Sequence, residues 1–362
     1  METDFSVWMG IQGLALSSEE KKALQESFIS GVVLFKRNIE SLSQLWELCQ
    51  EIHSLNPAPL MAMDREGGEV DRLKHLPEYP LWPSPAELAQ VCSLQEIEKT
   101  AFYMSQEMRD LGICVNFAPC VDILSVSNPL FKGRLWGNQV KSVSEKTLAW
   151  LNGLKKTGLA ACAKHFPGHG GVKEDSHVEL PVDQRNFESL KKKDTLPFQE
   201  MITAGVEMIM TAHVLYPKVD SLNPATLSSF FLQQVLRKQM GFSGLIVSDD
   251  LDMKALYKAD TSLPRIMAQA LEAGVDILLK CSPCVNEQEW IEPFNEALSQ
   301  NNTGRGQTEQ KRIKKGEGRI SAFRKKYSTI KPLPSLKALK TRGQDLRIKN
   351  WCDELTKRLT DA

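Results

Sequence analysis

The chain has 362 residues and no formal net charge, because 45 lysines and arginines balance 45 aspartates and glutamates. Its 42% of hydrophobic and 25% of charged residues are typical of a globular protein, which excludes a disordered, collagen-like or coiled-coil chain. The sequence contains no apolar run of about 18 residues, the length that spans a membrane, and shows no signal peptide at its start. We therefore expect a cytoplasmic protein, and one α/β barrel can hold a chain of this length.

Short apolar segments typical of buried strands alternate with segments of helical pattern along the chain. The expected strands lie within residues 7–14, 31–37, 60–68, 114–124, 159–169, 208–216, 244–253 and 275–282. The expected helices lie within residues 17–28, 41–55, 94–112, 142–158, 190–205, 228–242 and 265–274. Ser17 or Ser18 is the expected N-cap of the first helix. Several helices end at a glycine, the usual C-terminal signal: Gly112, Gly158, Gly205 and Gly274.

The regular alternation of strand and helix predicts a parallel sheet, and eight strands favour a closed barrel over an open sheet. The strands are continuous apolar runs, as expected when both faces are covered. No GxGxxG turn follows the first strand, which argues against a dinucleotide-binding fold. The predicted fold class is α/β, a single (β/α)8 TIM-type barrel over residues 1–300 with a C-terminal helical extension over residues 301–362.

The C-terminal extension differs in charge from the rest of the chain. From Asn301 onward it has 17 basic and 6 acidic residues, whereas residues 1–300 have 28 basic and 39 acidic residues. A polar linker is expected near residues 299–310, and two helices near 311–327 and 335–358. A basic surface for nucleic acid or membrane is an alternative, but no binding motif accompanies it. We expect a solvated helix face packed on the acidic body, with no nucleic-acid or membrane partner.

Nearly every expected strand ends in a residue with a reactive or polar side chain. In a TIM-type barrel the carboxyl ends of the strands converge on one rim, where active sites are built. Solvated loop residues would instead be scattered over both ends of the strands. The polar strand ends are Gln12, Lys36, Arg37, Asp64, Asp122, Lys164, His165, His213, Asp249 and Lys280.

Four of the six histidines fall between residues 165 and 213, which suggests metal ligation, acid–base catalysis or loop histidines without a functional role. The first strand has no H-x-H motif, and KHFPGH contains a proline and a glycine, so it cannot place two histidines on one helix turn. The CxxC of Cys281 and Cys284 has no second pair nearby. We therefore expect no metal site.

The acid–base interpretation rests on Asp175 and His177, which are two residues apart. In an extended segment they project to the same side, so the carboxylate can orient the imidazole and raise its basicity. Residues 168–185 are expected to form a loop over the rim. Asp249 is a rim carboxylate without an adjacent Ser, Cys or metal set, which suits nucleophilic attack in glycosyl transfer. Adjacent strand residues face opposite sides, so we expect only Asp249 or Asp250 to face the barrel mouth.

Several motifs together resemble a known family. KHFPGHG at 164–170, followed by the D-S-H of 175–177, is similar to the family 3 glycoside hydrolases, and specifically to their short β-N-acetylhexosaminidases of cell-wall recycling. DREGGEVDRL at 64–73 resembles the D-x-E-G-G-x-V-x-R segment of that family. NFAPCVDI, MTAHVLYP and GFSGLIVSDDLDM also match in content and order, so the resemblance spans about residues 5–285.

This resemblance implies a cytoplasmic exo-acting β-N-acetylglucosaminidase with a retaining mechanism and no cofactor. Asp249 would be the nucleophile, and His177 the general acid and base, oriented by Asp175. The implied substrate and partner is an N-acetylglucosaminyl-anhydromuramyl peptide from peptidoglycan, cleaved by a monomer. The implied sugar-binding residues are Asp64, Arg72, Arg134, Lys164, His165 and His213.

Two segments depart from the family pattern. Glu69 stands where the family usually has arginine, and the family's D-R-S-F segment reads GRLW at 133–136, which carries Arg134. Glu69 makes a degenerate glycan-binding module one alternative function. The histidine cluster makes a metal-dependent hydrolase a second. A phosphorylase that transfers the sugar to phosphate is a third, because a neutral histidine repels an anionic acceptor less than a carboxylate would.

Overall fold

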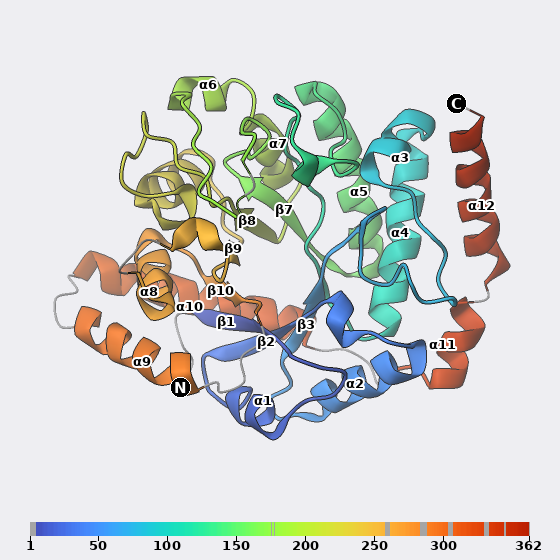
Figure 1. Ribbon diagram of the computed structural model, residues 1–362, viewed down its shortest axis with the longest axis horizontal. Coiled ribbons are helices and arrows are strands. Elements are labelled where there is room, and N and C mark those ends of the chain that lie inside the picture. Colours follow the sequence, from blue (N-terminus) through green and yellow to red (C-terminus); the bar gives the residue numbers. More distant parts are fainter. Residues whose placement is uncertain are drawn as a thin grey trace.

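The computed structural model describes residues 5–174, 176, 178–257, 261–282, 288–302, 307–328, 333–343 and 345–361. Eight parallel strands close into a barrel in the order β1-β10-β9-β8-β7-β6-β3-β2, and helices surround it (Figure 1). The predicted TIM-type barrel is confirmed, and each expected strand segment overlaps one barrel strand. These strands are β1 (Ser6–Gly10), β2 (Ile29–Leu34), β3 (Leu60–Met63), β6 (Val115–Asn116), β7 (Ala160–Phe166), β8 (Met208–Thr211), β9 (Leu245–Asp250) and β10 (Ile277–Lys280).

The helices of residues 1–302 agree with the expected segments with four differences. The segment 190–205 is broken into α6 and α7, the segment 228–242 is a π-helix, and α3 and α9 were not expected. Ser17 is the N-cap of the first helix, and the four predicted C-terminal glycines all have positive φ. The helices are α1 (Ser18–Ala23), α2 (Leu42–Ser54), α3 (Pro85–Val91), α4 (Leu94–Asp110), α5 (Val140–Thr157), α6 (Phe187–Lys191), α7 (Leu196–Thr203), η4 (Phe230–Gln239), α8 (Leu263–Ala273) and α9 (Gln288–Asn302).

A short antiparallel hairpin follows β3 and shapes the rim. Its strands are β4 (Arg65–Gly67) and β5 (Val70–Asp71). Gly67 and Gly68 have φ of 98° and 58°, values that glycine adopts without the strain of a side chain. The hairpin therefore reverses the chain within a few residues and brings its end back beside the end of β3.

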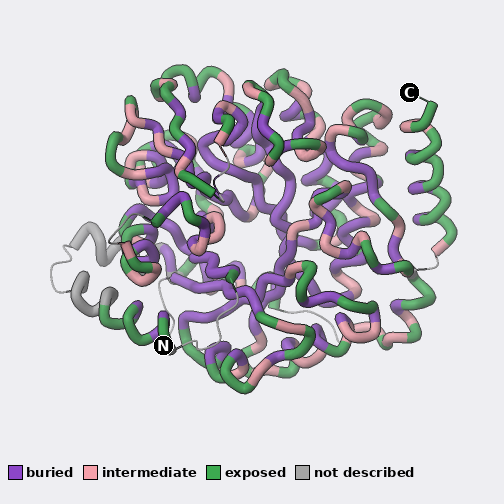
Figure 2. The backbone as a smooth tube through the Cα atoms, in the orientation of Figure 1, coloured by how far each residue is buried: buried purple, intermediate pink, exposed green. Residues whose placement is uncertain are grey.

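The buried residues form two main layers. One apolar cluster lies inside the barrel, and a larger one lies between the strands and the surrounding helices. Figure 2 shows that buried backbone dominates the strands, whereas exposed residues lie on the outer helices and loops. None of the helices in the described part of the chain is long and apolar enough to cross a membrane.

The C-terminal extension packs on the barrel through α10 (Gln307–Tyr327), α11 (Leu336–Gly343) and α12 (Leu346–Thr360), so the second expected helix is in fact two. Helix α10 adds Ile320, Phe323 and Tyr327 to the cluster inside the barrel. Ring centroids of Phe323 and Trp8 lie 6.4 Å apart. Since Tyr327 donates to Glu207, the residue before β8, α10 lies at the amino ends of the strands.

The basic side chains of the extension pair with the acidic body, as the charge asymmetry predicted. Arg319 contacts Asp276 at 2.5 Å, Lys326 contacts Glu207 at 3.2 Å, Arg358 contacts Glu96 at 2.8 Å, and Arg342 contacts Asp110. Trp351 of α12 donates to Thr100 of α4 at 3.0 Å, and Figure 1 shows α12 beside α4 and α3. The division of the chain at residue 300 stays a prediction.

We expect Phe323→Ala to lower the free energy of unfolding by about 3 kcal/mol, because it removes a buried ring and leaves a cavity at the closed end of the barrel. Chemical denaturation followed by circular dichroism measures this change. Lys325→Ala, at an exposed position on the same helix, is the matched control. Equal stability of the two variants would show that α10 does not close the barrel.

Candidate active site

A cavity of about 290 Å³ lies at the carboxyl ends of the barrel strands. Its walls are largely apolar, and its polar groups come from β3, β7, β9, the loops that follow them and the loop after β6. Six of the nine predicted site residues line it, so the expected convergence of strand ends on one rim is observed for them. The six are Asp64, Arg72, Arg134, Lys164, His165 and Asp249.

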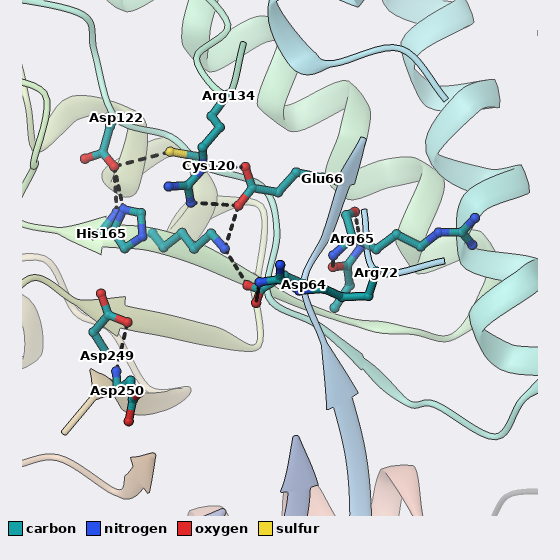
Figure 3. Close-up of polar contacts among 12 residues, drawn as sticks. Asp64, Arg65, Glu66, Arg72, Cys120, Asp122, Arg134, His165, Asp249 and Asp250 are labelled. Carbon is teal, nitrogen blue, oxygen red and sulfur yellow. Dashed lines mark hydrogen bonds and ion pairs between the residues drawn. The ribbon is translucent and has the colours of Figure 1, made fainter. Parts of the chain in front are cut away.

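Five alternating charges run along one side of the cavity, in the order Arg72, Asp64, Lys164, Glu66 and Arg134, and we call them the charge chain (Figure 3). Arg72 donates to Asp64 at 2.7 Å, and Lys164 donates to Asp64 at 2.8 Å. Lys164 also contacts Glu66 at 2.7 Å. Arg134 donates two hydrogen bonds to Glu66, of 2.8 and 3.0 Å. Each carboxylate therefore bridges two cations.

The cations keep both carboxylates ionised despite their burial. Burial alone raises the pKa of Asp64, but Lys164 and Arg72 hold it well below its usual range. Burial likewise raises the pKa of Glu66, but Arg134 and Lys164 lower it to about 2. Burial lowers the pKa of Lys164, and the two carboxylates raise it above its usual value. The site therefore presents fixed charges whose hydrogen-bonding groups suit a polar, hydroxyl-rich ligand.

Hydrogen bonds between the β4–β5 hairpin and β6 help to place the residues of the charge chain. The amide of Arg65 donates to the Asn116 side chain at 3.0 Å, and the Asn116 side chain donates to the Arg65 carbonyl at 2.9 Å. These bonds fix the β4–β5 hairpin against β6. Glu69 lies on this hairpin with a 90% exposed side chain and contacts Lys74 at 2.5 Å, so it lies outside the charge chain.

His165 is held by a buried carboxylate behind the cavity wall. Asp122 accepts from the His165 amide at 3.1 Å and lies 2.7 Å from its Nδ1. The other oxygen of Asp122 accepts from the His169 amide at 2.6 Å. Burial raises the pKa of Asp122, but the bond to His165 and the nearby histidines lower it to about 2. This aspartate therefore orients the whole KHFPGH segment.

One group of buried side chains has the composition of a metal site. Atoms of Cys120, Asp122 and His165 lie within 4.8 Å of one another. The same Asp122 oxygen, however, already accepts from Cys120 Sγ at 3.3 Å and lies 2.7 Å from His165 Nδ1. Burial also raises the pKa of Cys120 well above its usual value, which disfavours the thiolate that a metal requires. These donors fit a hydrogen-bonded cluster better than a metal site.

Asp249 and Asp250 both line the cavity, but the Asp250 carboxylate is bonded to backbone amides, so the expectation that only one of the two side chains faces the barrel mouth stays a prediction. The pairing of β9 with β10 shifts register between Ile277 and Leu279, which breaks the alternation of side chains there. The Asp250 carboxylate accepts from the amides of Cys281 and Asp252. Burial raises the pKa of Asp250 to about 6. Asp249 lies across the cavity from the charge chain in Figure 3.

His213 was expected to line the cavity, but it is not among the lining residues. Its Nδ1 lies 2.7 Å from the Thr226 hydroxyl, and its Nε2 lies 2.9 Å from the Asp250 carbonyl oxygen. The ring is fully buried and supports the backbone of β9 from behind. The strand-end pattern identified its position just after β8, but the direction of the ring depends on the fold of residues 225–227. Its predicted role in sugar binding stays a prediction.

The two residues predicted for acid–base catalysis, Asp175 and His177, lie outside the described residues. The residue between them is described, and Ser176 lines the cavity. Sequence reasoning missed Glu66 and His169 as site residues, although both belong to the quoted motifs. The glutamate in DREGG signalled Glu66, and the second histidine of KHFPGH signalled His169.

Residues 5–321 match the glycosyl hydrolase family 3 N-terminal domain. The chain belongs to this family. It is therefore an enzyme, a glycoside hydrolase built on a TIM-type barrel, as the motifs predicted. The match extends beyond residue 300 into α10, the helix that closes the barrel.

Similar proteins with curated names are beta-hexosaminidases. That of Methylococcus capsulatus is 37% identical over 309 residues, which cover 85% of this chain and 91% of the relative. That of Nitrosospira multiformis is 37% identical over 283 residues, which cover 76% of this chain and 80% of the relative.

Two solved structures are also similar to this chain. NagZ from Neisseria gonorrhoeae in complex with N-trifluoroacetyl-D-glucosamine has a TM-score of 0.78 and 29% identity, and the alignment covers 99% of this chain and 98% of NagZ. A beta-N-acetylglucosaminidase from Paenibacillus has a TM-score of 0.88 and 29% identity, and the alignment covers 97% of this chain and 67% of that one.

The ion pairs of the charge chain make the free energy of unfolding depend on pH in the acidic range. Since the pKa of Glu66 is about 2 in the folded state and about 4.5 when unfolded, the unfolded chain binds more protons below about pH 4.5, and stability falls as the pH drops toward 2. We expect Glu66→Gln to lower the free energy of unfolding by roughly 3 kcal/mol at neutral pH and by less as the pH approaches 3.

Denaturant titrations of wild type and Glu66→Gln between about pH 7 and pH 3 measure this difference. Glu69→Gln, a change on the exposed part of the same segment, is the matched control and should not alter stability measurably. A difference between Glu66→Gln and wild type that does not depend on pH would refute the role of the Glu66 charge.

Proposed function

We propose that this glycoside hydrolase is an exo-acting β-N-acetylglucosaminidase that retains the anomeric configuration. The observation that carries the proposal is Asp249, a carboxylate at the end of β9 that lines the same cavity as the charge chain. The names of the curated relatives and of the Paenibacillus neighbour support the choice of an N-acetylhexosamine as the sugar.

The size of the cavity favours recognition of one terminal sugar. A volume of about 290 Å³ is at the lower end of small-molecule sites. The charge chain forms one polar side, and apolar side chains, among them Phe35, Phe117 and Met210, form much of the rest. Asp64 would accept hydrogen bonds from sugar hydroxyls, and Arg72, Arg134, Lys164 and His165 would donate to hydroxyls or to the acetamido group.

The proposed reaction is a double displacement. A carboxylate oxygen of Asp249 attacks the anomeric carbon, and the bond from that carbon to the leaving-group oxygen breaks. His177 donates a proton to the leaving group and then accepts one from the water that releases the sugar from Asp249. Asp175 orients His177. Two inversions at the anomeric carbon restore its original configuration.

The proposed substrate is an N-acetylglucosaminyl-anhydromuramyl peptide derived from peptidoglycan, which a monomer would cleave in the cytoplasm. A terminal N-acetylglucosamine would enter the cavity, and the muramyl peptide would leave as the aglycone. The N-trifluoroacetyl-D-glucosamine bound to the neighbouring NagZ structure supports the sugar part of this assignment.

We expect Asp249→Asn to lower the rate on a chromogenic N-acetylglucosaminide by at least about 1000-fold, because an amide cannot form the glycosyl ester. Mass spectrometry of the wild type after reaction with a 2-fluoro sugar should find the label on Asp249. Asp353→Asn, an exposed change on α12, is the control and should retain the wild-type rate.

Label on another residue, or equal rates in Asp249→Asn and wild type, would refute the mechanism. A wild-type rate that rises with added phosphate would identify a phosphorylase instead of a hydrolase.

We expect the loss of rate in His177→Ala to depend strongly on the leaving group. A poor leaving group needs protonation, so its rate should fall by about 100-fold or more, whereas an activated nitrophenyl leaving group should lose far less. Steady-state kinetics with a series of aryl N-acetylglucosaminides measures this dependence. A uniform loss over the series would contradict the acid role of His177.

A further inference from the structure

We propose that His169 is a positioning residue that holds Ser176 and thereby fixes the part of the β7–α6 loop on which acid–base catalysis depends. This inference rests on the proposed function for its catalytic consequence. The contact itself, between a ring on one side of the loop and the serine between the two predicted acid–base residues, does not depend on it.

His169 itself has a fixed place at the end of β7. Its amide donates to Asp122 at 2.6 Å. Its ring packs against Phe131 and His165, with ring centroids 5.2 and 5.9 Å apart. A side chain at Gly170 would collide with the carbonyl of Ile123, so the chain beyond His169 must run close to the β6–α5 loop. These contacts therefore hold the ring of His169 in a fixed position.

The ring is connected to the acid–base segment through one nitrogen. Nε2 of His169 lies 3.3 Å from the hydroxyl of Ser176. The carbonyl of Ser176 accepts from the amide of Ala255, in the loop after β9, at 3.4 Å. Ser176 is thus held from two strands, by its side chain toward β7 and by its backbone toward β9, the strand that carries Asp249.

The protonation state of the ring fits this role. Nδ1 of His169 is buried and has no hydrogen-bond partner among the described residues. Burial and the neighbouring His165 lower the pKa of His169 to about 4, so the ring is neutral at neutral pH. A neutral ring has one N–H, and placing it on Nε2 pairs it with Ser176 and leaves only a lone pair on Nδ1. An unpaired buried N–H on Nδ1 would cost more.

The upstream part of the loop has separate supports. The side-chain amide of Asn128 donates to the carbonyls of Val172 and Glu174 at 3.2 and 3.3 Å. The carbonyl of Gly170 accepts two backbone amides of the β6–α5 loop. Loss of the His169 contact therefore should not release residues 170–174, but should release the chain around Ser176. Ser176 is adjacent in the sequence to the proposed acid–base residues Asp175 and His177, so we expect loss of its anchor to affect catalysis by them.

The proposal is tested with three variants and their combination. His169→Phe keeps a ring against Phe131 and His165 but removes the donor, His169→Gln keeps an N–H at similar reach, and Ser176→Ala removes the hydroxyl. If the two residues act through each other, the double variant His169→Phe with Ser176→Ala should be no worse than either single variant. Lys173→Gln, at an exposed position of the same loop, is the control.

We expect His169→Phe to lower kcat on a poor leaving group by about 10- to 100-fold, with a much smaller loss on an activated one, because acid catalysis is misaligned. His169→Gln should recover part of that loss. Equal loss on both leaving groups, or additive effects in the double variant, would overturn the proposal and assign His169 a direct contact with substrate.

Hydrogen–deuterium exchange provides a readout that needs no substrate. His169→Phe and Ser176→Ala should both raise exchange in peptides that cover residues 175–180, whereas the control should not. Unchanged exchange would overturn the proposed anchor. If the wild type cleaved no N-acetylglucosaminide, the proposed function would fail, and exchange would still decide whether His169 holds Ser176.

Discussion

The charge chain is the constraint on which the rest of the active site depends. It joins the end of β3, the β4–β5 hairpin, the β6–α5 loop and β7, so these segments meet only if their charges are paired. Five buried or half-buried charges are costly to remove from water, and breaking one pair leaves an uncompensated charge. The same low-polarity surroundings make the fixed charges strong and oriented hydrogen-bonding groups for a sugar. The buried charges therefore lower the stability of the fold, but they hold the hydrogen-bonding groups of the site in a fixed orientation before a ligand binds.

The two ends of the barrel have different roles: one contributes stability, and the other carries the active site. At the amino ends of the strands, Phe323 and Tyr327 of α10 complete the apolar interior, which contributes stability without affecting the chemistry. At the carboxyl ends, charged groups replace apolar ones. The basic extension belongs to the first task, because Arg319 and Lys326 pair with acidic residues that directly precede strands. The charge asymmetry of the sequence thus reflects packing within the chain.

Sequence periodicity identified the barrel because each strand is a short apolar run, and strand ends located Asp64, Lys164, His165 and Asp249. It failed where side-chain direction depends on distant contacts. The ring of His213 turns toward Thr226, and the pairing of β9 with β10 shifts register near Asp250. Glu66 was missed because its partner Arg134 lies 68 residues away in the sequence. Local patterns predict positions, whereas pairing across loops requires the fold.

In the proposed mechanism, one buried carboxylate would couple sugar binding to acid–base catalysis. Asp122 accepts from the amide of His165 through one oxygen, which also lies 2.7 Å from the His165 ring, and from the amide of His169 through the other. His165 lines the sugar cavity, and His169 contacts Ser176 in the acid–base segment. A displacement of Asp122 would move both histidines at once. In the proposed mechanism, sugar binding and the placement of the acid would therefore depend on each other, because one carboxylate on the loop after β6 holds both His165 and His169.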